Sequence, residues 1–298
     1  MKKNWLIVRL IIWLSWIAGL TIVALCVWTW LSDGSSVVAL KWLQLLQTLS
    51  IFLLPPLLTA WICCERPWHW LHLDQGMSWQ TALFAIAVML CALPGINLLS
   101  DLNRQMVLPD CLSRLEEMLR SQEDAANQLT ESFLQTRSIG GMLLNVLLMA
   151  LLPALGEELT FRGLLTNFMD KKDSENYQKH ALSTRTHIAI WAVAAIFSFV
   201  HFQFYGFVPR MLMGAMFGYM LAWTGSLWIP ILMHFTNNAM AVVAYYLTYN
   251  GVIAEDTLDT IGCGSTLWAG ILSIAIVACA LAAYPRLKKY PKEASEAE

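Results

Sequence analysis

Residues 139–162 read IGGMLLNVLLMALLPALGEELTFR, an apolar run that continues without a break into two glutamates and an arginine. The apolar part predicts a membrane-spanning helix, and a charged side chain inside such a helix costs at least ~2.5 kcal/mol. Two adjacent carboxylates here therefore indicate a functional site. On a helix, Glu158 and Arg162 share one face and can pair, whereas Glu157 points about 100° away. The alternative is a helix end at the membrane interface, whose charges extend to water.

Two further motifs place polar side chains inside apolar segments. Phe197 is followed one helical turn later by His201, and His234 is followed one turn later by Asn238. Taken singly, a buried histidine is more often a hydrogen-bonded core residue, and Asn238 can simply link two helices. The ionisable and amide groups are nevertheless concentrated in three membrane segments and almost absent from the others. This concentration predicts one shared polar site.

The three motifs, EExxxR, FxxxH and HxxxN in this order, resemble the signature of the CPBP family of intramembrane proteases. This family holds the type II CAAX prenyl endopeptidases and the bacteriocin-processing and immunity-associated Abi proteins. The resemblance covers roughly residues 139–250, and the motifs are jointly specific although each alone is weak. It implies a metal-independent hydrolase, an intramembrane endopeptidase with no cofactor. Its substrate would be a peptide or membrane protein, and prenylated CAAX peptides are the best known substrates of the family.

The resemblance also implies a role for each candidate residue. These residues are Glu157, Glu158, Arg162, His201, His234 and Asn238. Glu157 would activate a water that His201 shares, His234 and Asn238 would stabilise the oxyanion, and the remaining glutamate and arginine would form a supporting pair. Cutting an amide needs a base, donors for the oxyanion and a proton source for the leaving amine. These side chains can supply all three.

One other mechanism for the same reaction and two other functions remain open from the sequence. Glu157, His201 and His234 also form a set of two histidines and a glutamate, which catalytic zinc favours, although the chain has no HExxH helix. A membrane scaffold or immunity-type protein could bind a peptide in the same polar cavity without cutting it. A transporter could use these groups as a proton relay, but inverted repeats and paired broken helices are missing. The number of ionisable groups favours an enzyme.

The composition is that of a membrane protein. The chain is 57% hydrophobic and 13% charged, which is far from the averages of soluble domains. A net charge of −2 without a basic block makes nucleic acid an unsuitable partner, so the lipid bilayer is the expected environment. The seven cysteines are scattered without the spacing of a disulfide framework or a zinc site.

Apolar stretches of about 20 residues predict an all-α membrane protein, a polytopic helical bundle of about eight transmembrane helices. The expected spans are 5–31, 37–62, 79–100, 139–161, 187–204, 209–223, 226–248 and 265–284. Three parts follow: N-terminal helices with an outer amphipathic segment (1–138), a protease-like core (139–250), and a last helix with a cytoplasmic tail (251–298). Within the sixth span, Gly214 and Gly218 predict close contact with another helix.

Basic residues favour cytoplasmic loops, and here they gather at both termini and in residues 171–185. Both termini are therefore expected in the cytoplasm, in a multi-pass protein of the inner membrane. The motif glutamates would then lie at the cytoplasmic end of the fourth span, in a cavity opening toward the cytosol. Residues 101–138 show apolar positions at near-helical spacing among charges, which predicts amphipathic helices over the outer face. A cap is the favoured interpretation of this segment, and a mobile lid is the alternative.

Overall fold

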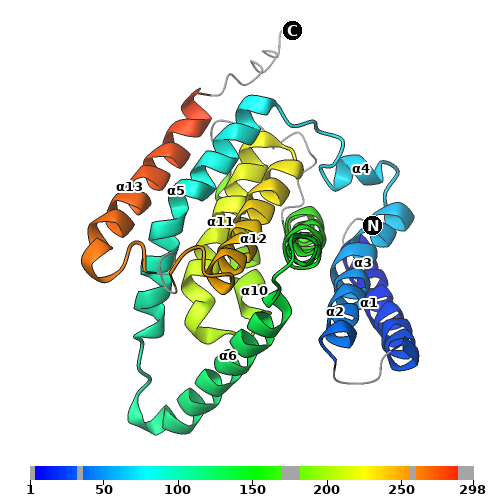
Figure 1. The fold of residues 1–298 in the computed structure, drawn as a ribbon. Coiled ribbons are helices and arrows are strands. Elements are labelled where there is room, and N and C mark those ends of the chain that lie inside the picture. The colour runs from blue at the N-terminus through cyan, green and yellow to red at the C-terminus, as the bar shows by residue number, and fades with distance from the viewer. Residues whose placement is uncertain (1–3, 32–35, 170–181, 255–259, 288–298) are drawn as a thin grey trace.

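The computed structural model describes residues 4–31, 36–169, 182–254 and 260–287, and these residues form helices and turns without a strand (Figure 1). Long helices pack side by side, and one amphipathic helix crosses an end of the bundle (Figure 1). The predicted all-α membrane bundle is thus confirmed. An apolar chain in a bilayer must satisfy its own backbone hydrogen bonds, which a helix does within one segment.

The N-terminal helices form a group at one side of the molecule, shown in blue in Figure 1. Helix α1 (Asn4–Leu31) packs along α2 (Val37–Gln47) and α3 (Leu54–Cys63), which are joined by the π-helical turn η1 (Thr48–Leu53). The short helix α4 (Pro67–Trp70) then leads toward the rest of the bundle. This group borders the fourth span through contacts of η1 and α3.

Helix α5 (Trp79–Arg104) pairs with α13 (Leu267–Leu287) along the opposite side of the bundle. A proline inside α5 removes one backbone donor from that helix. The hydroxyl of Ser273 on α13 compensates at this place: it accepts from the Gly95 N–H at 3.0 Å and donates to the Cys91 carbonyl. The two helices are thereby fixed to each other at the proline.

The predicted amphipathic segment is a single long helix, α6 (Ser113–Leu134), which follows the turn η2 (Asp110–Leu112). It crosses the end of the bundle opposite to α4 (Figure 1). Its buried residues, Phe133 and Leu134, lie at its C-terminal end, so most of the helix is a cover rather than part of the core.

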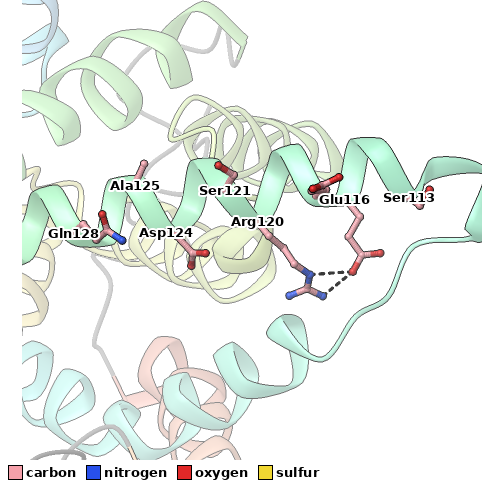
Figure 2. A pocket seen from close by; sticks show the side chains of 8 residues that line it. Ser113, Glu116, Arg120, Ser121, Asp124, Ala125 and Gln128 are labelled. Atoms are coloured by element: carbon pink, nitrogen blue, oxygen red, sulfur yellow. Dashed lines mark hydrogen bonds and ion pairs between the residues drawn. The ribbon is translucent and has the colours of Figure 1, made fainter.

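A hollow of about 670 Å³ runs along α6, with Glu116 accepting hydrogen bonds of 2.9 and 2.8 Å from Arg120 beside it (Figure 2). All of its lining side chains belong to this one helix, from Ser113 to Gln128. It is an open surface hollow and contains none of the motif residues.

The fourth span is one continuous helical segment with two π-helical turns in it. Its parts are α7 (Ile139–Asn145), η3 (Val146–Leu151), α8 (Leu152–Glu158), η4 (Leu159–Leu165) and α9 (Thr166–Met169). Such turns are rare in helices and are frequent at functional sites. Here the second one begins directly after the paired glutamates, Glu157 and Glu158. The motif therefore lies where the helix changes its winding.

The remaining helices carry the other two motifs. They are α10 (Thr184–Phe199), the turn η6 (Phe204–Gly206), α11 (Phe207–Thr224), α12 (Trp228–Tyr249) and the turn η7 (Gly264–Thr266). Helices α10 and α11 approach closely at two glycines: a Cβ on Gly214 would lie 3.3 Å from the Ala194 Cα, and one on Gly218 would lie 2.9 Å from the Ile190 Cγ2. The predicted close contact of these glycines is confirmed.

Five of the described helical segments are long and apolar enough to cross a membrane, so the expected number of eight is not confirmed. They are Trp5–Leu31, Val37–Cys63, Trp79–Arg104, Ile139–Met169 and Gly264–Leu287. Helix α10 is apolar but has only 16 residues. The fourth span also extends to Met169 instead of ending at residue 161, because Glu158 and Arg162 pair inside the helix and need not reach its end.

Candidate active site

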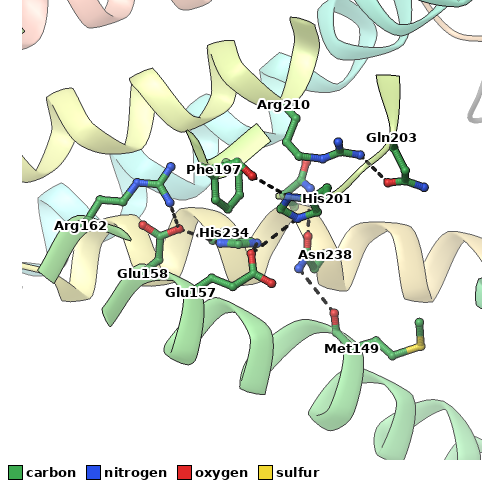
Figure 3. Close-up of polar contacts among 11 residues, drawn as sticks. Met149, Glu157, Glu158, Arg162, Phe197, His201, Gln203, Arg210, His234 and Asn238 are labelled. Carbon is green, nitrogen blue, oxygen red and sulfur yellow. Dashed lines mark hydrogen bonds and ion pairs between the residues drawn. The ribbon is translucent and has the colours of Figure 1, made fainter. Parts of the chain in front are cut away.

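The motif residues meet where four elements come together (Figure 3). Helix α8 supplies the two glutamates and η4 supplies the arginine. The turn after α10 supplies His201, and α12 supplies His234 and Asn238. Residues separated by up to about 80 positions in the sequence thus lie around one polar centre inside an apolar bundle.

A buried ion pair forms the base of this centre. Arg162 Nη1 donates to Glu158 Oε1 at 2.7 Å, and Arg162 Nη2 donates to the Gly214 carbonyl at 3.1 Å. The two side chains are only 1% and 0% exposed. The guanidinium also lies 4.4 Å from the ring centre of Phe197 and 5.4 Å from that of Phe217. The pairing expected from the four-residue spacing is therefore present, and it is closed off from solvent.

Gly214 permits this arrangement because a side chain there would contact the guanidinium of Arg162 too closely. A Cβ at this position would lie 3.0 Å from Arg162 Nη2 and 3.2 Å from a ring carbon of Phe197. Contacts this short force a neighbour to move. The close approach of α11 thus presents a backbone carbonyl to the arginine.

His234 connects the ion pair to the other glutamate, Glu157. Its Nδ1 lies 2.8 Å from Glu158 Oε1, and a carboxylate oxygen accepts, so Nδ1 carries the proton. Its ring stacks on Phe217 at 5.5 Å between centres. Its Nε2 then points to the other carboxylate, 3.9 Å from Glu157 Oε2.

His201 is oriented in the same way by a different partner. Its Nδ1 lies 2.7 Å from the Phe197 carbonyl, which can only accept, so this nitrogen also carries a proton. In the neutral ring the lone pair is then on Nε2, which lies 3.8 Å from Glu157 Oε2. The Phe197 that precedes His201 by one turn thus orients it through its backbone and packs edge-on against its ring at 4.9 Å.

Glu157 Oε2 is the point on which both histidines converge. It is buried and has no hydrogen-bond partner within the described parts of the chain. Separations of 3.8 and 3.9 Å are too long for direct hydrogen bonds. They are clearly shorter than the ~4.6 Å between two atoms that each make a ~2.8 Å hydrogen bond to one oxygen at a tetrahedral angle. They exceed the ~3.3 Å between two ligands of one tetrahedral zinc ion.

Asn238 lies beside this group but is directed elsewhere. Its Nδ2 donates to the Met149 carbonyl at 3.4 Å, and its Oδ1 accepts from Asn237 at 3.1 Å (Figure 3). The structure therefore brings Glu157, His201 and His234 together directly, whereas Asn238 is adjacent to them with its amide turned to the fourth span.

The comparisons with known proteins agree with this geometry. Residues 139–240 match the family of Rce1-like type II CAAX prenyl endopeptidases. The predicted resemblance to the CPBP family is confirmed over this segment, which contains all three motifs. The Rce1-like match supports a fold of the CAAX-protease type. Together with its apolar helices, it shows an integral, multi-pass membrane protein.

A curated relative is also found, although its own function is not known. The uncharacterized protein YpbD of Bacillus subtilis (strain 168) is 28% identical over 100 residues, which cover 32% of this chain and 43% of that protein. The chain thus aligns with less than half of the length of this relative. None of the solved structures matches at a significant level.

The site lies within the helical segment Ile139–Met169, which continues beyond the glutamates to Met169. His201 is the most exposed of the three converging side chains, at 29% against 15% for Glu157 and 8% for His234. The turn that follows His201 is bonded to α6, because Glu123 accepts from the Tyr205 N–H at 3.0 Å.

Of the basic segment, the structure describes residues 182–185. Arg185, at the start of α10, donates to the carbonyl of Met169 at 2.9 Å, where the fourth span ends. The orientation predicted from the basic residues would place this end of the span in the cytoplasm.

Sequence reasoning missed a second arginine in this site. Arg210 is the only charged residue of α11, and its guanidinium lies beside His201 (Figure 3). Its Nη2 donates to Gln203 Oε1 at 2.7 Å. The rule that singled out Glu157 and Glu158, a charge inside an apolar helix, applies equally to Arg210 and would have found it.

Proposed function

We propose that this protein is an intramembrane endopeptidase in which Glu157 activates a water for attack on a peptide bond. The observation that carries the proposal is the convergence of two histidine Nε2 atoms on Glu157 Oε2, each ring being fixed through its Nδ1. A base next to a fixed hydrogen-bond acceptor orients a water for attack. Residues 139–250 would form the catalytic core, and the preceding and following helices would hold it in the bilayer.

The reaction follows from these positions. The water donates one hydrogen bond to Glu157 Oε2 and the other to His201 Nε2, which leaves an oxygen lone pair for the scissile carbonyl. Glu157 accepts the proton as the C–O bond forms. It then passes this proton to the amide nitrogen as the C–N bond breaks, releasing an amine and a carboxylic acid that ionises. No group besides water and the peptide is consumed.

His234 is suited to stabilise the oxyanion in its doubly protonated form. Nδ1–H then donates to Glu158, and Nε2–H points into the site. In this state the charges of Glu157 and Glu158 are balanced by those of Arg162 and His234, as an apolar surrounding requires. The Asn238 amide would join by exchanging its weak 3.4 Å bond to a backbone carbonyl for the oxyanion.

The test is hydrolysis of a peptide library by the purified protein in detergent. Glu157→Gln keeps the shape of the side chain but cannot take the proton, so kcat is expected to fall ~10² to 10⁴-fold. Glu117→Gln is the matched control, because it is the same change on the exposed face of α6. Equal activity of Glu157→Gln and wild type would refute the assigned role.

Two measurements separate this mechanism from the alternatives. The two histidines and Glu157 have the composition of a zinc site, so stoichiometric zinc in the active protein, with activity lost on chelation, would replace the glutamate mechanism by a metal one. If the protein cuts no peptide but binds one, it is a scaffold with the same fold. The orientation with both termini in the cytoplasm remains part of the proposal and is tested by labelling from each side.

A further inference from the structure

Arg210 is a half-buried cation whose hydrogen bonds are incomplete. One arm of its guanidinium, Nη2, donates to Gln203 Oε1 at 2.7 Å. The other arm, Nη1, is buried and has no hydrogen-bond partner in the described part of the protein. No carboxylate of a described residue lies within ion-pair distance of it; Glu123 and Glu157 interact with it only at longer range. Buried polar groups in native proteins are almost always bonded, so an exception of this kind points to a ligand.

The position of Arg210 connects it to the proposed reaction. It interacts electrostatically with both Glu157 and His201, which are the base and its partner. Figure 3 shows its guanidinium on the side of His201 that faces away from Glu158 and Arg162. It therefore stands at the approach to the site and not in the buried ion pair. In the proposed state, Glu157 and Glu158 are already neutralised by Arg162 and His234. The positive charge of Arg210 is therefore left to neutralise an incoming anion.

The turn around Arg210 is fixed in the way that a binding group requires. Glu123 accepts from Tyr205 N–H at 3.0 Å, and Asn103 Oδ1 accepts from Val208 N–H at 2.9 Å. Gly206 lies flat against the guanidinium: a Cβ there would be 2.9 Å from Nη2 and 3.6 Å from Nη1. A donor held in place before its ligand arrives loses little entropy on binding.

We propose that Arg210, oriented by Gln203, binds a carboxylate of the peptide substrate next to the scissile bond and so determines specificity. The guanidinium is the side chain whose geometry best matches a carboxylate, and the free arm is directed away from the groups that already neutralise each other. The carboxylate is either the C-terminus of the peptide or an acidic side chain. This inference rests on the proposed peptidase function, because it names the chemistry of the substrate at the same site.

The experiment compares peptides that differ in one carboxylate. For a sequence cut by the wild type, three forms are made: the free acid, the C-terminal amide, and a form with each Asp or Glu replaced by Asn or Gln. Wild type is expected to prefer the form that keeps the recognised carboxylate by about 10- to 100-fold in kcat/KM, the range of one charge-assisted hydrogen bond. Arg210→Gln removes this preference, mainly through KM, so that its kcat/KM values for the acid and amide forms become nearly equal. Arg114→Gln, on the exposed face of α6, is the matched control and keeps the preference.

Two results overturn the proposal. If Arg210→Gln lowers the hydrolysis of the acid and amide forms equally, Arg210 supports the turn or the oxyanion and does not read a carboxylate. If the wild type cuts all three forms equally, no carboxylate is recognised. Thermal unfolding of Arg210→Gln and Arg210→Lys shows whether the variants are folded, and Arg210→Lys should retain part of the preference because it keeps the charge.

Binding makes this test independent of turnover. Fluorescence anisotropy of labelled acid and amide peptides is measured on the Glu157→Gln protein, with and without Arg210→Gln. Tighter binding of the acid that disappears with Arg210→Gln supports the carboxylate site even if the wild type cuts nothing, in which case only the proposed catalysis has failed. Equal binding of acid and amide peptides contradicts the carboxylate site even if peptides are cut.

Discussion

Removing Arg162 while leaving Glu158 should destabilise the protein strongly. Glu158 is 0% exposed, and its Oε1 accepts from both Arg162 and His234. In Arg162→Met a side chain of similar length remains, but the carboxylate loses its cation and the Gly214 carbonyl loses its donor. Breaking a buried ion pair by removing one partner costs about 3–5 kcal/mol. That is a large part of the 5–15 kcal/mol by which proteins are stable.

A second substitution should restore most of this loss. In Glu158→Gln with Arg162→Met, the amide oxygen still accepts from His234 Nδ1, and neither member of the ion pair is left behind as a single buried charge. Replacing both members of a buried pair is often neutral, whereas each single change leaves one charge alone. The double variant should therefore be more stable than the sum of the two single effects by about 2–3 kcal/mol. It should remain inactive, because the doubly protonated His234 has lost its counter-charge.

The assay is unfolding in mixed detergent micelles, followed by tryptophan fluorescence, to which the 14 tryptophans contribute. Wild type, both single variants and the double variant form the cycle, and Arg114→Met on the exposed face of α6 is the control for loss of an arginine. Additive effects of the two substitutions would show that the pair does not hold the site together. Full activity of the double variant would refute the role given to the charge of His234.

Four further outcomes are expected. Gly214→Ala, whose Cβ would lie 3.0 Å from the buried guanidinium, should cost about 1–3 kcal/mol of unfolding free energy, and an unchanged stability would contradict the close approach of α11. Asn238→Ala should lower kcat ~10² to 10³-fold with little change in KM if its amide reaches the oxyanion, whereas a change in KM alone would place it on the substrate. Burial lowers the pKa of His72, in the turn after α4, to about 4, so stability should fall as pH drops from 6.5 toward 4; His72→Asn, which tolerates the same positive φ, should flatten this dependence in thermal unfolding. Single cysteines labelled from each side of the membrane should place residues 110–130 outside and residues 171–185 inside, and the reverse result would contradict the orientation predicted from the basic residues.

The fold was predictable to the extent that it follows from local hydropathy. The apolar runs at residues 5–31, 79–104 and 264–287 were found almost to their ends, since long apolar segments have few alternatives to a membrane helix. The predicted number of membrane-spanning helices was not confirmed because of α10, α11 and α12. There the helices are shorter or carry the polar residues of the site, and such residues are tolerated only because neighbouring helices bury and bond them.

The candidate site shows the same division. The pairing of Glu158 with Arg162 was predictable, because a four-residue separation on a helix fixes which side chains meet. The convergence of His201 and His234 on Glu157 was expected from the concentration of polar groups in three membrane segments and from the family resemblance. The direction of their Nε2 atoms was not, because it depends on the Phe197 carbonyl and on Glu158, which only packing brings to the rings.

By itself, the sequence determined that the protein is a helical membrane bundle, which residues carry its motifs, and that one carboxylate is paired on its own helix. These properties depend on hydropathy and on the fixed geometry of one helix. The tertiary structure alone decided that Arg210 lies beside His201 with one arm unbonded, and that the turn after His201 is bonded to α6. Both depend on where separate helices end and how closely they pack, which is set by contacts between residues far apart in the chain.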